Sequence, residues 1–258
     1  MSELEGPIGR FVDIEWVDST GSTNTDLANL VRDDATRPLS ILIADEQVAG
    51  RGRRDRRWET PPRSAVLMSC HVRWPELASA HMVPTALGIA AVDAISAFDR
   101  RVLLKWPNDL VSVDGRKVAG MLTEVVASRP GPVDLVCGIG CNVSWPTDTS
   151  GFESGIGLDA LGAEPVNRVE LARAIVESFD ACLDDASRLG GNAQRDRYRE
   201  RSATIGQYVR AEQSAGTIEG LATDVDNEGR LIIDVGGRLI TVDVGDVVHL
   251  RPAGGAGG

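Results

Sequence analysis

The chain has 258 residues, of which 42% are hydrophobic and 25% are charged, and its formal net charge is −11. These are ordinary globular values at a length that suits one large domain, or one domain with a small module, and the acidic balance argues against general binding to nucleic acids or anionic membranes. Four cysteines are too few for a disulfide scaffold, and the acidic N-terminus is not a secretory signal. No apolar run is long enough to span a bilayer. We therefore expect a cytoplasmic protein without a membrane span.

Strands and helices are predicted in turn over the first 100 residues. Residues 18–24 are polar and turn-forming, and they precede a helical pattern that begins with Leu27. A side chain of this segment is therefore expected to cap the helix. Short strands are expected over 40–44 and 65–74, followed by a long, mostly buried helix over 79–98.

Strands also dominate the middle of the chain. Asp114-Gly115 is a strong hairpin signal between two apolar runs. The expected strands cover 102–105, 109–113, 117–126 and 133–143, and helices are expected over 168–189 and 192–201. This order lacks the regular strand–helix–strand alternation of a Rossmann fold, and the chain has no GxGxxG or GxxxxGK[ST] motif. We therefore predict the α+β class.

The character of the sequence changes near residue 204. Residues 206–251 form short β-rich runs between turn signals spaced about ten residues apart, which favours a small all-β barrel. The final residues are glycine-rich and typical of a flexible tail. We predict a large domain over 1–204, a β-barrel domain over 205–252 and a tail over 253–258.

Residues 50–58 hold five arginines in an otherwise acidic chain, in the order Gly-Arg-Gly-Arg-Arg-Asp-Arg-Arg-Trp. Glycine lets backbone approach a ligand closely, and arginine binds phosphate or carboxylate through paired hydrogen bonds. The segment is therefore a candidate anion-binding loop. A solvated, charged surface loop is the alternative, and it is the more common explanation for an arginine run taken alone.

Four further segments carry polar groups at the ends of predicted strands or helices. Each has an ordinary structural explanation: a helix cap, a β-turn, a lysine at a strand edge, or a strand that contains glycine. Each also offers ligand contacts, and glycine inside a strand often marks the close approach of a ligand. The segments are Ser22-Thr23-Asn24, Lys105-Trp106-Pro107-Asn108-Asp109, Arg116-Lys117-Val118-Ala119-Gly120 and Gly138-Ile139-Gly140-Cys141-Asn142.

In this order and spacing, the five segments resemble the bacterial biotin protein ligase family, which includes biotin–[acetyl-CoA-carboxylase] ligase. The family shows S-T-N, Q-x-A-G-R-G-R-x-x-R-x-W, K-W-P-N-D, R-K-x-A-G and G-I-G-x-N segments, and the second spans 47–58 here. The resemblance covers nearly the whole chain. It implies a class II aminoacyl-tRNA synthetase-like domain, with a central mixed, largely antiparallel sheet flanked by helices, and a small SH3-like β-barrel. Because the motifs begin near residue 20, we expect the monofunctional class that lacks an N-terminal DNA-binding domain.

The resemblance also implies the chemistry. Members of the family activate biotin with ATP to give biotinyl-5′-AMP and pyrophosphate, and then transfer biotin to a lysine of a biotin carboxyl carrier domain of an acyl-CoA or pyruvate carboxylase. The expected substrates are biotin and ATP, with Mg²⁺ as the metal. DNA is not expected as a partner, and the protein is expected to be a monomer or a weak homodimer.

The family motifs carry over to this chain residue by residue. Lys117, Arg53 and Asp109 are the expected catalytic residues, and Asp109 is also the candidate Mg²⁺ ligand. The expected biotin-binding residues are Ser22, Thr23, Asn24, Gln47, Arg51, Gly52, Arg53, Lys117, Gly120, Gly138 and Gly140. The expected ATP- or adenylate-binding residues are Arg51, Arg53, Trp58, Lys105, Asn108, Asp109 and Asn142. The loop 50–58 is expected to be mobile until an anionic ligand orders it, because its arginines repel one another.

Two other functions stay open at this point. A lipoate or octanoate ligase of related fold is the nearer alternative, although lipoate enzymes carry a different loop in place of the R-G-R and K-W-P-N-D motifs. A nucleic-acid-binding protein that uses Arg51–Arg57 is the second, and the net charge of −11 argues against it. The sequence assigns no general base for the acceptor lysine.

Overall fold

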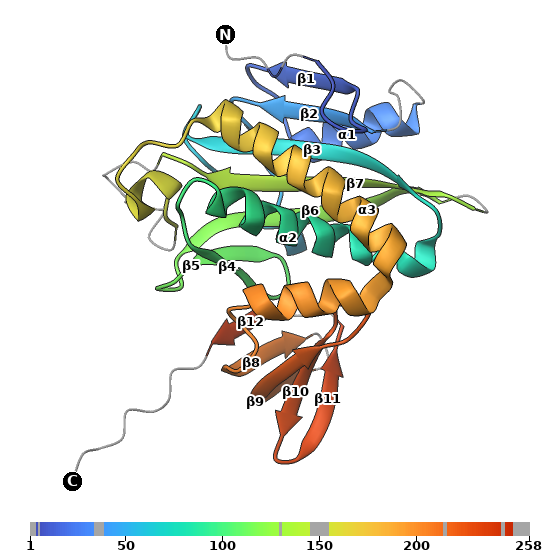
Figure 1. Ribbon diagram of the computed structural model, residues 1–258, viewed down its shortest axis with the longest axis vertical. Coiled ribbons are helices and arrows are strands. Elements are labelled where there is room, and N and C mark those ends of the chain that lie inside the picture. The colour runs from blue at the N-terminus through green and yellow to red at the C-terminus, as the bar shows by residue number, and fades with distance from the viewer. Residues whose placement is uncertain are drawn as a thin grey trace.

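Two β-sheets and three α-helices make up the described part of the chain (Figure 1). The computed structural model describes residues 4, 6–33, 39–128, 131–144, 155–213, 216–243 and 246–249. The helices are α1 (Thr23–Arg32), α2 (Met82–Ser96) and α3 (Arg168–Arg201), and short 3-10 turns cover Arg53–Asp55, Leu77–Ser79 and Leu158–Leu161. The strands are β1 (Asp13–Val17), β2 (Ser40–Ala44), β3 (Ala65–Trp74), β4 (Val102–Lys105), β5 (Asp109–Ser112), β6 (Lys117–Ser128), β7 (Val133–Asn142), β8 (Tyr208–Gln213), β9 (Gly216–Val225), β10 (Leu231–Val235), β11 (Arg238–Val242) and β12 (Asp246–His249).

The larger sheet has seven strands in the order β1-β2-β3-β7-β6-β5-β4. Strands β1 and β2 are parallel, and every other neighbouring pair is antiparallel. Short turns join β4 to β5 and β5 to β6, which is the connection that antiparallel neighbours allow, whereas the parallel pair is joined through α1. The predicted mixed, largely antiparallel sheet flanked by helices is confirmed.

The two faces of this sheet bury different helices. Successive strand residues point to opposite faces, so Ile43 joins the large core with α2 and α3, while Leu42 joins a smaller cluster with α1. On β7, Val136 belongs to the α1 face, and Gly138 and Gly140 continue the same face along the strand. The α1 face therefore has a stretch of sheet without large side chains of its own.

The last five strands form a second, antiparallel sheet in the order β11-β10-β9-β8-β12. The helices predicted over 168–189 and 192–201 are the two halves of α3, which bends at Gly190. The φ angle of Gly190 is 74°, in the left-handed region that glycine adopts easily. The second half of α3 leads directly into the smaller sheet (Figure 1).

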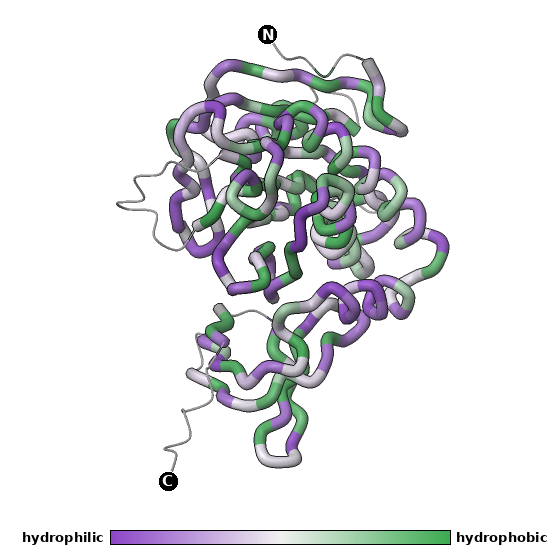
Figure 2. The backbone as a smooth tube through the Cα atoms, turned by 60° about the vertical axis from the view of Figure 1, so that its left-hand side comes forward, coloured by the Kyte–Doolittle hydropathy of each residue, from purple (hydrophilic) through white to green (hydrophobic). Residues whose placement is uncertain are grey.

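Hydrogen bonds from the β4–β5 region hold the smaller sheet against the larger one. Trp106 Nε1 donates to the carbonyl oxygen of Gly229 at 2.9 Å, and Ala203 N donates to the carbonyl oxygen of Leu104 at 2.7 Å. The peptide bond between Trp106 and Pro107 is cis. The backbone trace shows the smaller sheet beneath the larger one (Figure 2).

Most element boundaries follow the prediction closely. β2, β3 and β4 have the predicted bounds, β5 ends one residue early, and β6 extends to Ser128. α2 is shorter than predicted at both ends, and a separate turn, Leu77–Ser79, precedes it. β1 was not predicted, although its sequence, DIEWV, alternates acidic and apolar residues as a half-buried edge strand does. The predicted β-rich region over 206–251 lies partly outside the described residues, and the predicted tail over 253–258 lies wholly outside them.

α2 is the most apolar helix of the fold. The segment Leu77–Ser96 is long and apolar enough to cross a membrane by length and composition alone, but 67% of its apolar window is buried inside the protein. α2 packs beside α3 against one face of the larger sheet (Figure 1), and 11 of its residues are buried. Burial in the core accounts for the apolar composition of this helix.

Asp45, directly after β2, connects three parts of the fold. Its carboxylate accepts hydrogen bonds from Trp16 Nε1 at 3.0 Å, from Arg168 Nη2 at 2.9 Å and from Arg63 Nε at 2.9 Å. Burial alone would raise the pKa of Asp45, but the hydrogen bonds from Arg168 and Trp16 outweigh burial, and the net effect is a lowered pKa. The folded protein therefore favours the charged carboxylate.

Replacing Asp45 by asparagine is expected to lower the free energy of unfolding by about 1–2 kcal/mol at pH 7, because hydrogen bonds to a charged group are weakened. The pKa is lower in the folded than in the unfolded chain, so this stabilisation is complete above the ordinary carboxyl pKa of about 4 and is lost as the pH falls through the folded value. Urea unfolding at pH 7 and pH 3 measures the change, and the difference from the unsubstituted protein should shrink at pH 3.

The matched control is Glu219→Gln, which removes the exposed ion pair of Glu219 with Arg210 at 2.7 Å. Its effect should stay below about 0.5 kcal/mol, because exposed pairs are screened by solvent. An equally large loss for Asp45→Asn at both pH values would contradict the assigned role of the charge.

Candidate active site

A cavity of about 370 Å³ lies on the α1 face of the larger sheet. The first turn of α1, the loop 47–58, the β4–β5 turn, β6, β7 and two strands of the smaller sheet, β8 and β12, supply its walls. Every site residue predicted from the sequence lines it except Asn142. The predicted residues in the wall are Ser22, Thr23, Asn24, Gln47, Arg51, Gly52, Arg53, Trp58, Lys105, Asn108, Asp109, Lys117, Gly120, Gly138 and Gly140.

Asn142 is buried behind the cavity rather than in its wall. Its side chain is 2% exposed, and Nδ2 donates to the carbonyl oxygens of Lys117 at 3.4 Å and Ile156 at 3.3 Å. Strand alternation alone would place Asn142 on the same face as Gly140, but residues 155–156 pair with the start of β6 and cover this end of the face. Asn142 therefore supports the backbone that carries Lys117.

Polar groups from α1 and β3 form a connected network at one end of the cavity. Ser22 holds the N-cap position of α1, but its side chain makes no capping hydrogen bond, so the predicted side-chain cap is absent there. Gln47 Oε1 accepts from Thr23 N at 2.8 Å and from Thr23 Oγ1 at 3.0 Å. Ser69 Oγ lies 2.8 Å from Thr23 Oγ1 and 2.7 Å from Asn24 Oδ1. Hydroxyl and amide groups of this kind suit a neutral polar ligand group.

The glycines of β6 and β7 leave room that protein side chains use. A Cβ atom at Gly138 would overlap the amide of Asn24. A Cβ at Gly140 would lie 2.5 Å from Trp58 Cε2, and one at Gly120 would lie 3.0 Å from Trp58 Cζ3. The prediction assigned this room to the ligand. In the structure, the side chains of Asn24 and Trp58 occupy it and form part of the cavity wall themselves.

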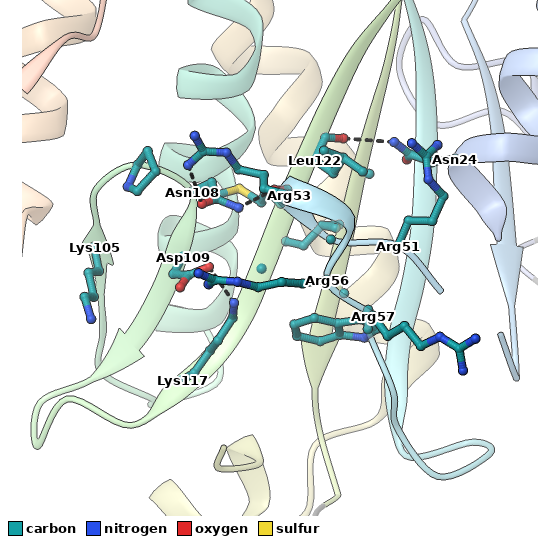
Figure 3. Close-up of a pocket in the computed structure, with 18 of the residues that line it drawn as sticks. Asn24, Arg51, Arg53, Arg56, Arg57, Lys105, Asn108, Asp109, Lys117 and Leu122 are labelled. Carbon is teal, nitrogen blue, oxygen red and sulfur yellow. Dashed lines mark hydrogen bonds and ion pairs between the residues drawn. The ribbon is translucent and has the colours of Figure 1, made fainter. Parts of the chain in front are cut away.

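Lys117 and Asp109 form an ion pair in the middle of the cavity (Figure 3). Lys117 opens β6 and Asp109 opens β5, and Lys117 Nζ lies 2.7 Å from Asp109 Oδ1. The same Nζ lies 5.4 Å from the centre of the Trp58 ring, which is cation–π distance. The two side chains are 37% and 26% exposed, so the ammonium is reachable from the cavity.

The loop 50–58 folds back on itself at the mouth of the cavity. Gly52 N donates to Arg56 O at 2.7 Å, and Trp58 N donates to Gly50 O at 3.0 Å. At its tip, Arg54 has a φ of 54°, in the left-handed region. We call residues 50–58 the arginine lid. Its expected mobility stays a prediction.

Two arginines of the lid reach opposite walls of the cavity. Arg51 Nη1 lies 3.0 Å from Glu124 Oε1 on β6, and Arg53 Nη1 donates to Asn108 Oδ1 at 3.2 Å on the β4–β5 turn. Figure 3 shows Arg53 extending from the lid toward Asn108, and Arg51 extending toward the side of the cavity where Asn24 lies. The lid is therefore attached to both walls through Arg51 and Arg53, two side chains that the sequence analysis assigned to ligand binding.

The cavity is basic although the protein is acidic. Six cationic side chains line it, against the two carboxylates of Asp109 and Glu212 among the described residues of the wall. The cationic residues are Arg51, Arg53, Arg56, Arg57, Lys105 and Lys117. Within the described residues, no group of three or more His, Cys, Asp and Glu side chains could hold a metal ion. The site is suited to an anionic ligand.

Sequence reasoning missed the part of the wall that the smaller sheet supplies. Glu212, Val247 and Val248 line the cavity, and Arg54 Nη2 donates to the carbonyl oxygen of Glu212 at 3.3 Å. No local pattern marks these residues, because they reach the site only through the packing of the two sheets. Glu124 was also missed, but it had a signal: it continues the alternating face of β6 from Gly120.

The fold and the cavity define a two-sheet protein whose cavity is suited to a small molecule with a neutral polar end and an anionic part. Residues 16–143 match the Biotin/lipoate A/B protein ligase family, and residues 204–250 match the Biotin protein ligase C terminal domain. The chain belongs to this ligase family.

Similar proteins cover nearly the whole chain. The biotin–[acetyl-CoA-carboxylase] ligase of Mycobacterium tuberculosis is 35% identical over 256 residues, which cover 96% of this chain and 93% of that protein. The bifunctional ligase/repressor BirA of Escherichia coli is 28% identical over 98% of this chain and 77% of its own length. The structure of the biotin protein ligase from Aquifex aeolicus in complex with biotin and ATP superposes with a TM-score of 0.79, at 20% identity over 93% of this chain and 99% of that chain.

Proposed function

We propose that this protein is a biotin protein ligase, which joins biotin to a lysine of a carrier protein through biotinyl-5′-AMP. The observation that carries the proposal is the order of groups along the cavity. The hydroxyl and amide network lies beside Gly138, Trp58 lies over Gly140, and the Lys117 ammonium follows at the start of β6. Biotin has a neutral ureido ring, an apolar chain and a terminal carboxylate in the same order.

In the first step, a carboxylate oxygen of biotin attacks the α-phosphorus of ATP, and the bond from that phosphorus to pyrophosphate breaks. Both partners are anions, so alignment and charge neutralisation carry most of the catalysis. We assign Lys117 to hold the carboxylate against the α-phosphate, and Arg51 and Arg53 to fold over biotin and the phosphates. These assignments are supported by the basic character of the cavity and by the lid side chains that line it.

In the second step, the amine nitrogen of the acceptor lysine attacks the acyl carbon and loses a proton. The bond from that carbon to the oxygen that bridges it to phosphorus breaks, and AMP leaves with the bridging oxygen. No covalent enzyme intermediate is needed. The groups assigned to the ureido end are Ser22, Thr23, Asn24 and Gln47, and those assigned to the nucleotide end are Trp58, Lys105, Asn108 and Asp109. Asn142 acts from behind, through its hydrogen bond to the Lys117 carbonyl.

Mg²⁺ fits this site as an ion held mainly by the substrate. Mg²⁺ is usually bound through one or two carboxylates together with substrate phosphates and water. Asp109 is the carboxylate beside Lys117 that could serve, and the described wall offers no dense cluster of acidic ligands. The ion would supply charge neutralisation on the phosphates.

The finer points of the proposal concern domains and partners. Residues 1–204 form the biotin- and ATP-binding domain, with a class II aminoacyl-tRNA synthetase-like architecture, and residues 205–252 form an SH3-like barrel. The family matches over 16–143 and 204–250 support this division. The acceptor is a biotin carboxyl carrier domain of a carboxylase in the cytoplasm, and the name of a similar ligase, which gives acetyl-CoA carboxylase as its substrate, supports a carboxylase. The protein works as a monomer or weak homodimer without DNA.

The experiment that tests the proposal is ATP–pyrophosphate exchange with biotin, lipoate and octanoate in parallel. Exchange should require biotin and should not be supported by the other two acids. Exchange with lipoate or octanoate would instead identify a lipoate-type ligase, which the first matched family also includes. No exchange with any acid, together with salt-dependent binding to DNA, would leave nucleic-acid binding through the lid as the function.

A further inference from the structure

Glu212 lines the mouth of the cavity from the smaller sheet. It is an exposed residue of β8, and its carbonyl oxygen accepts a hydrogen bond from Arg54 Nη2 at 3.3 Å, so it lies beside the tip of the arginine lid. Among the described residues of the wall, the only other carboxylate is that of Asp109. The cavity therefore has one acidic group next to Lys117 and one at its entrance.

The two carboxylates differ in their partners. Asp109 Oδ1 lies 2.7 Å from Lys117 Nζ, so a cation of the protein already neutralises its charge. Glu212 makes no ion pair with any residue in the described part of the chain. A carboxylate without such a partner, at the entrance of a basic cavity, is available to a cation that arrives from outside.

The second step of the proposed reaction brings a cation to this cavity. A lysine side chain is positively charged at neutral pH, and the wall that receives it has six cationic side chains against two carboxylates. A bound biotinyl-AMP adds only one negative charge, at its phosphate, so the wall stays positive. The charge that suits biotin and ATP therefore repels the acceptor lysine.

We propose that Glu212 binds the ammonium group of the acceptor lysine at the mouth of the cavity, before that lysine reaches the adenylate. The inference rests on the proposed function, because the acceptor lysine belongs to its second step. Val247 and Val248 of β12, the strand that pairs with β8, also line the cavity. Their apolar side chains suit the four-carbon stem of a lysine whose charged end contacts a carboxylate.

Glu212 does not take the proton that the amine must lose. A carboxylate is a far weaker base than an amine, so Glu212 keeps its negative charge throughout the step. As the ammonium moves inward from Glu212 toward Lys117, the surrounding cations disfavour its charged form, and a proton passes to water. The amine nitrogen then bonds to the acyl carbon and loses a second proton to water, while the bond from that carbon to the bridging oxygen of AMP breaks. Transfer in this order needs no general base on the protein.

Glu212→Gln is expected to lower kcat/KM for transfer to a biotin carboxyl carrier domain about tenfold, which corresponds to the loss of a charged contact of ~1.4 kcal/mol. The measurement starts from biotinyl-AMP already formed on the enzyme and varies the carrier concentration. ATP–pyrophosphate exchange should not fall, because biotin and ATP are anions that gain nothing from a carboxylate at the entrance. An unchanged kcat/KM for the carrier would overturn the proposal.

Hydroxylamine separates the ammonium contact from a structural role of Glu212. It is uncharged at neutral pH and attacks the same acyl carbon, giving biotin hydroxamate and AMP. Glu212→Gln should leave its reaction with the bound adenylate within about twofold of the unsubstituted protein, because a neutral nucleophile has no charge for the carboxylate to attract. An equal loss with hydroxylamine and with the carrier would mean that the substitution disturbs the cavity, and would overturn the proposal.

Two control variants match the change in charge and in size. Glu219→Gln makes the same substitution in an exposed ion pair with Arg210 on the smaller sheet, and should leave transfer within about twofold. Glu212→Asp keeps the carboxylate and should retain at least about a third of the transfer rate. If Glu219→Gln slows transfer as much as Glu212→Gln, the carrier responds to the overall charge of the smaller sheet, and the specific contact is wrong.

The exchange assay distinguishes failure of this inference from failure of the proposed function. If the unsubstituted protein shows no biotin-dependent exchange and labels no carrier, the ligase function is wrong and the inference falls with it. If both steps proceed and Glu212→Gln transfers biotin to the carrier at the normal rate, only the inference is wrong.

Discussion

Replacing Lys117 by methionine is expected to lower biotin-dependent ATP–pyrophosphate exchange by about a thousandfold, the size of loss seen when a group that stabilises developing charge is removed. Lys117 Nζ lies 2.7 Å from Asp109 Oδ1, so the substitution also leaves a carboxylate without its cation where two anions must meet. Methionine keeps an unbranched side chain against Trp58. The loss should appear mainly in kcat, because the repulsion between carboxylate and phosphate is greatest in the transition state.

Lys105→Met provides the control, because Lys105 is the other lysine of the same cavity wall. Its effect should stay within about tenfold if it contacts only the outer phosphates. Thermal unfolding of both variants shows whether the fold is kept. Equal losses for the two lysines would mean that the cavity needs positive charge in general, and the specific role given to Lys117 would be wrong.

Arg53→Gly is expected to adenylate biotin but to release the adenylate before transfer, so that bystander proteins are labelled on many lysines. Arg53 Nη1 donates to Asn108 Oδ1 at 3.2 Å and so ties the lid to the β4–β5 turn. Biotinyl-AMP is an activated mixed anhydride that must be shielded from water and stray amines. Labelling of an added lysine-rich protein should rise at least about tenfold over the unsubstituted protein, as measured by avidin blotting.

Arg54→Gly is the matched control for the lid. Arg54 already has a left-handed φ of 54°, which glycine adopts without strain, so this change removes a charge and the exposed hydrogen bond to the Glu212 carbonyl while keeping the course of the loop. Bystander labelling should stay within about twofold of the unsubstituted protein. If Arg53→Gly labels only the true acceptor, the shielding role is wrong, and if Arg54→Gly leaks equally, the lid works through its total charge.

The same loop gives an independent readout by proteolysis. Trypsin cleavage after the arginines of residues 51–57 should slow sharply when biotin and ATP are added together, because an anion between the lid and Lys117 offsets the repulsion among the arginines. Arg53→Gly should lose part of this protection. Cleavage that is equally fast with and without the ligands would remove the basis for a ligand-ordered lid.

The strands and the motif positions could be predicted because their signals are local. β2, β3 and β4 are short apolar runs bounded by turn residues, and the bounds of all three were predicted correctly. The five motifs lie at strand ends, in loops and at a helix N-terminus, and the larger sheet brings residues of all five into one cavity. A sheet with mainly antiparallel neighbours does this because its hairpins return the chain to the same face repeatedly.

The remaining features depended on packing that no single segment encodes. Asn142 has the right alternation for the cavity face but is covered by residues 155–156. No sequence motif near Glu212 indicates a functional site. Glu212 lines the cavity because the smaller sheet packs against the β4–β5 region. Glu124 followed a visible pattern on β6, but its importance appears only once Asn24 and Arg51 are seen to share it.

The glycines beneath the cavity set a limit on how its substrate range can be redesigned. Shrinking a wall residue is the usual route to a larger pocket, but Gly120, Gly138 and Gly140 are already the smallest residues available. The room above them is taken by Asn24 and Trp58, which occupy it from α1 and from the lid. An enzyme that accepts a bulkier cofactor analogue must therefore be obtained by changing those two side chains, one of which also belongs to the polar network and the other to the lid.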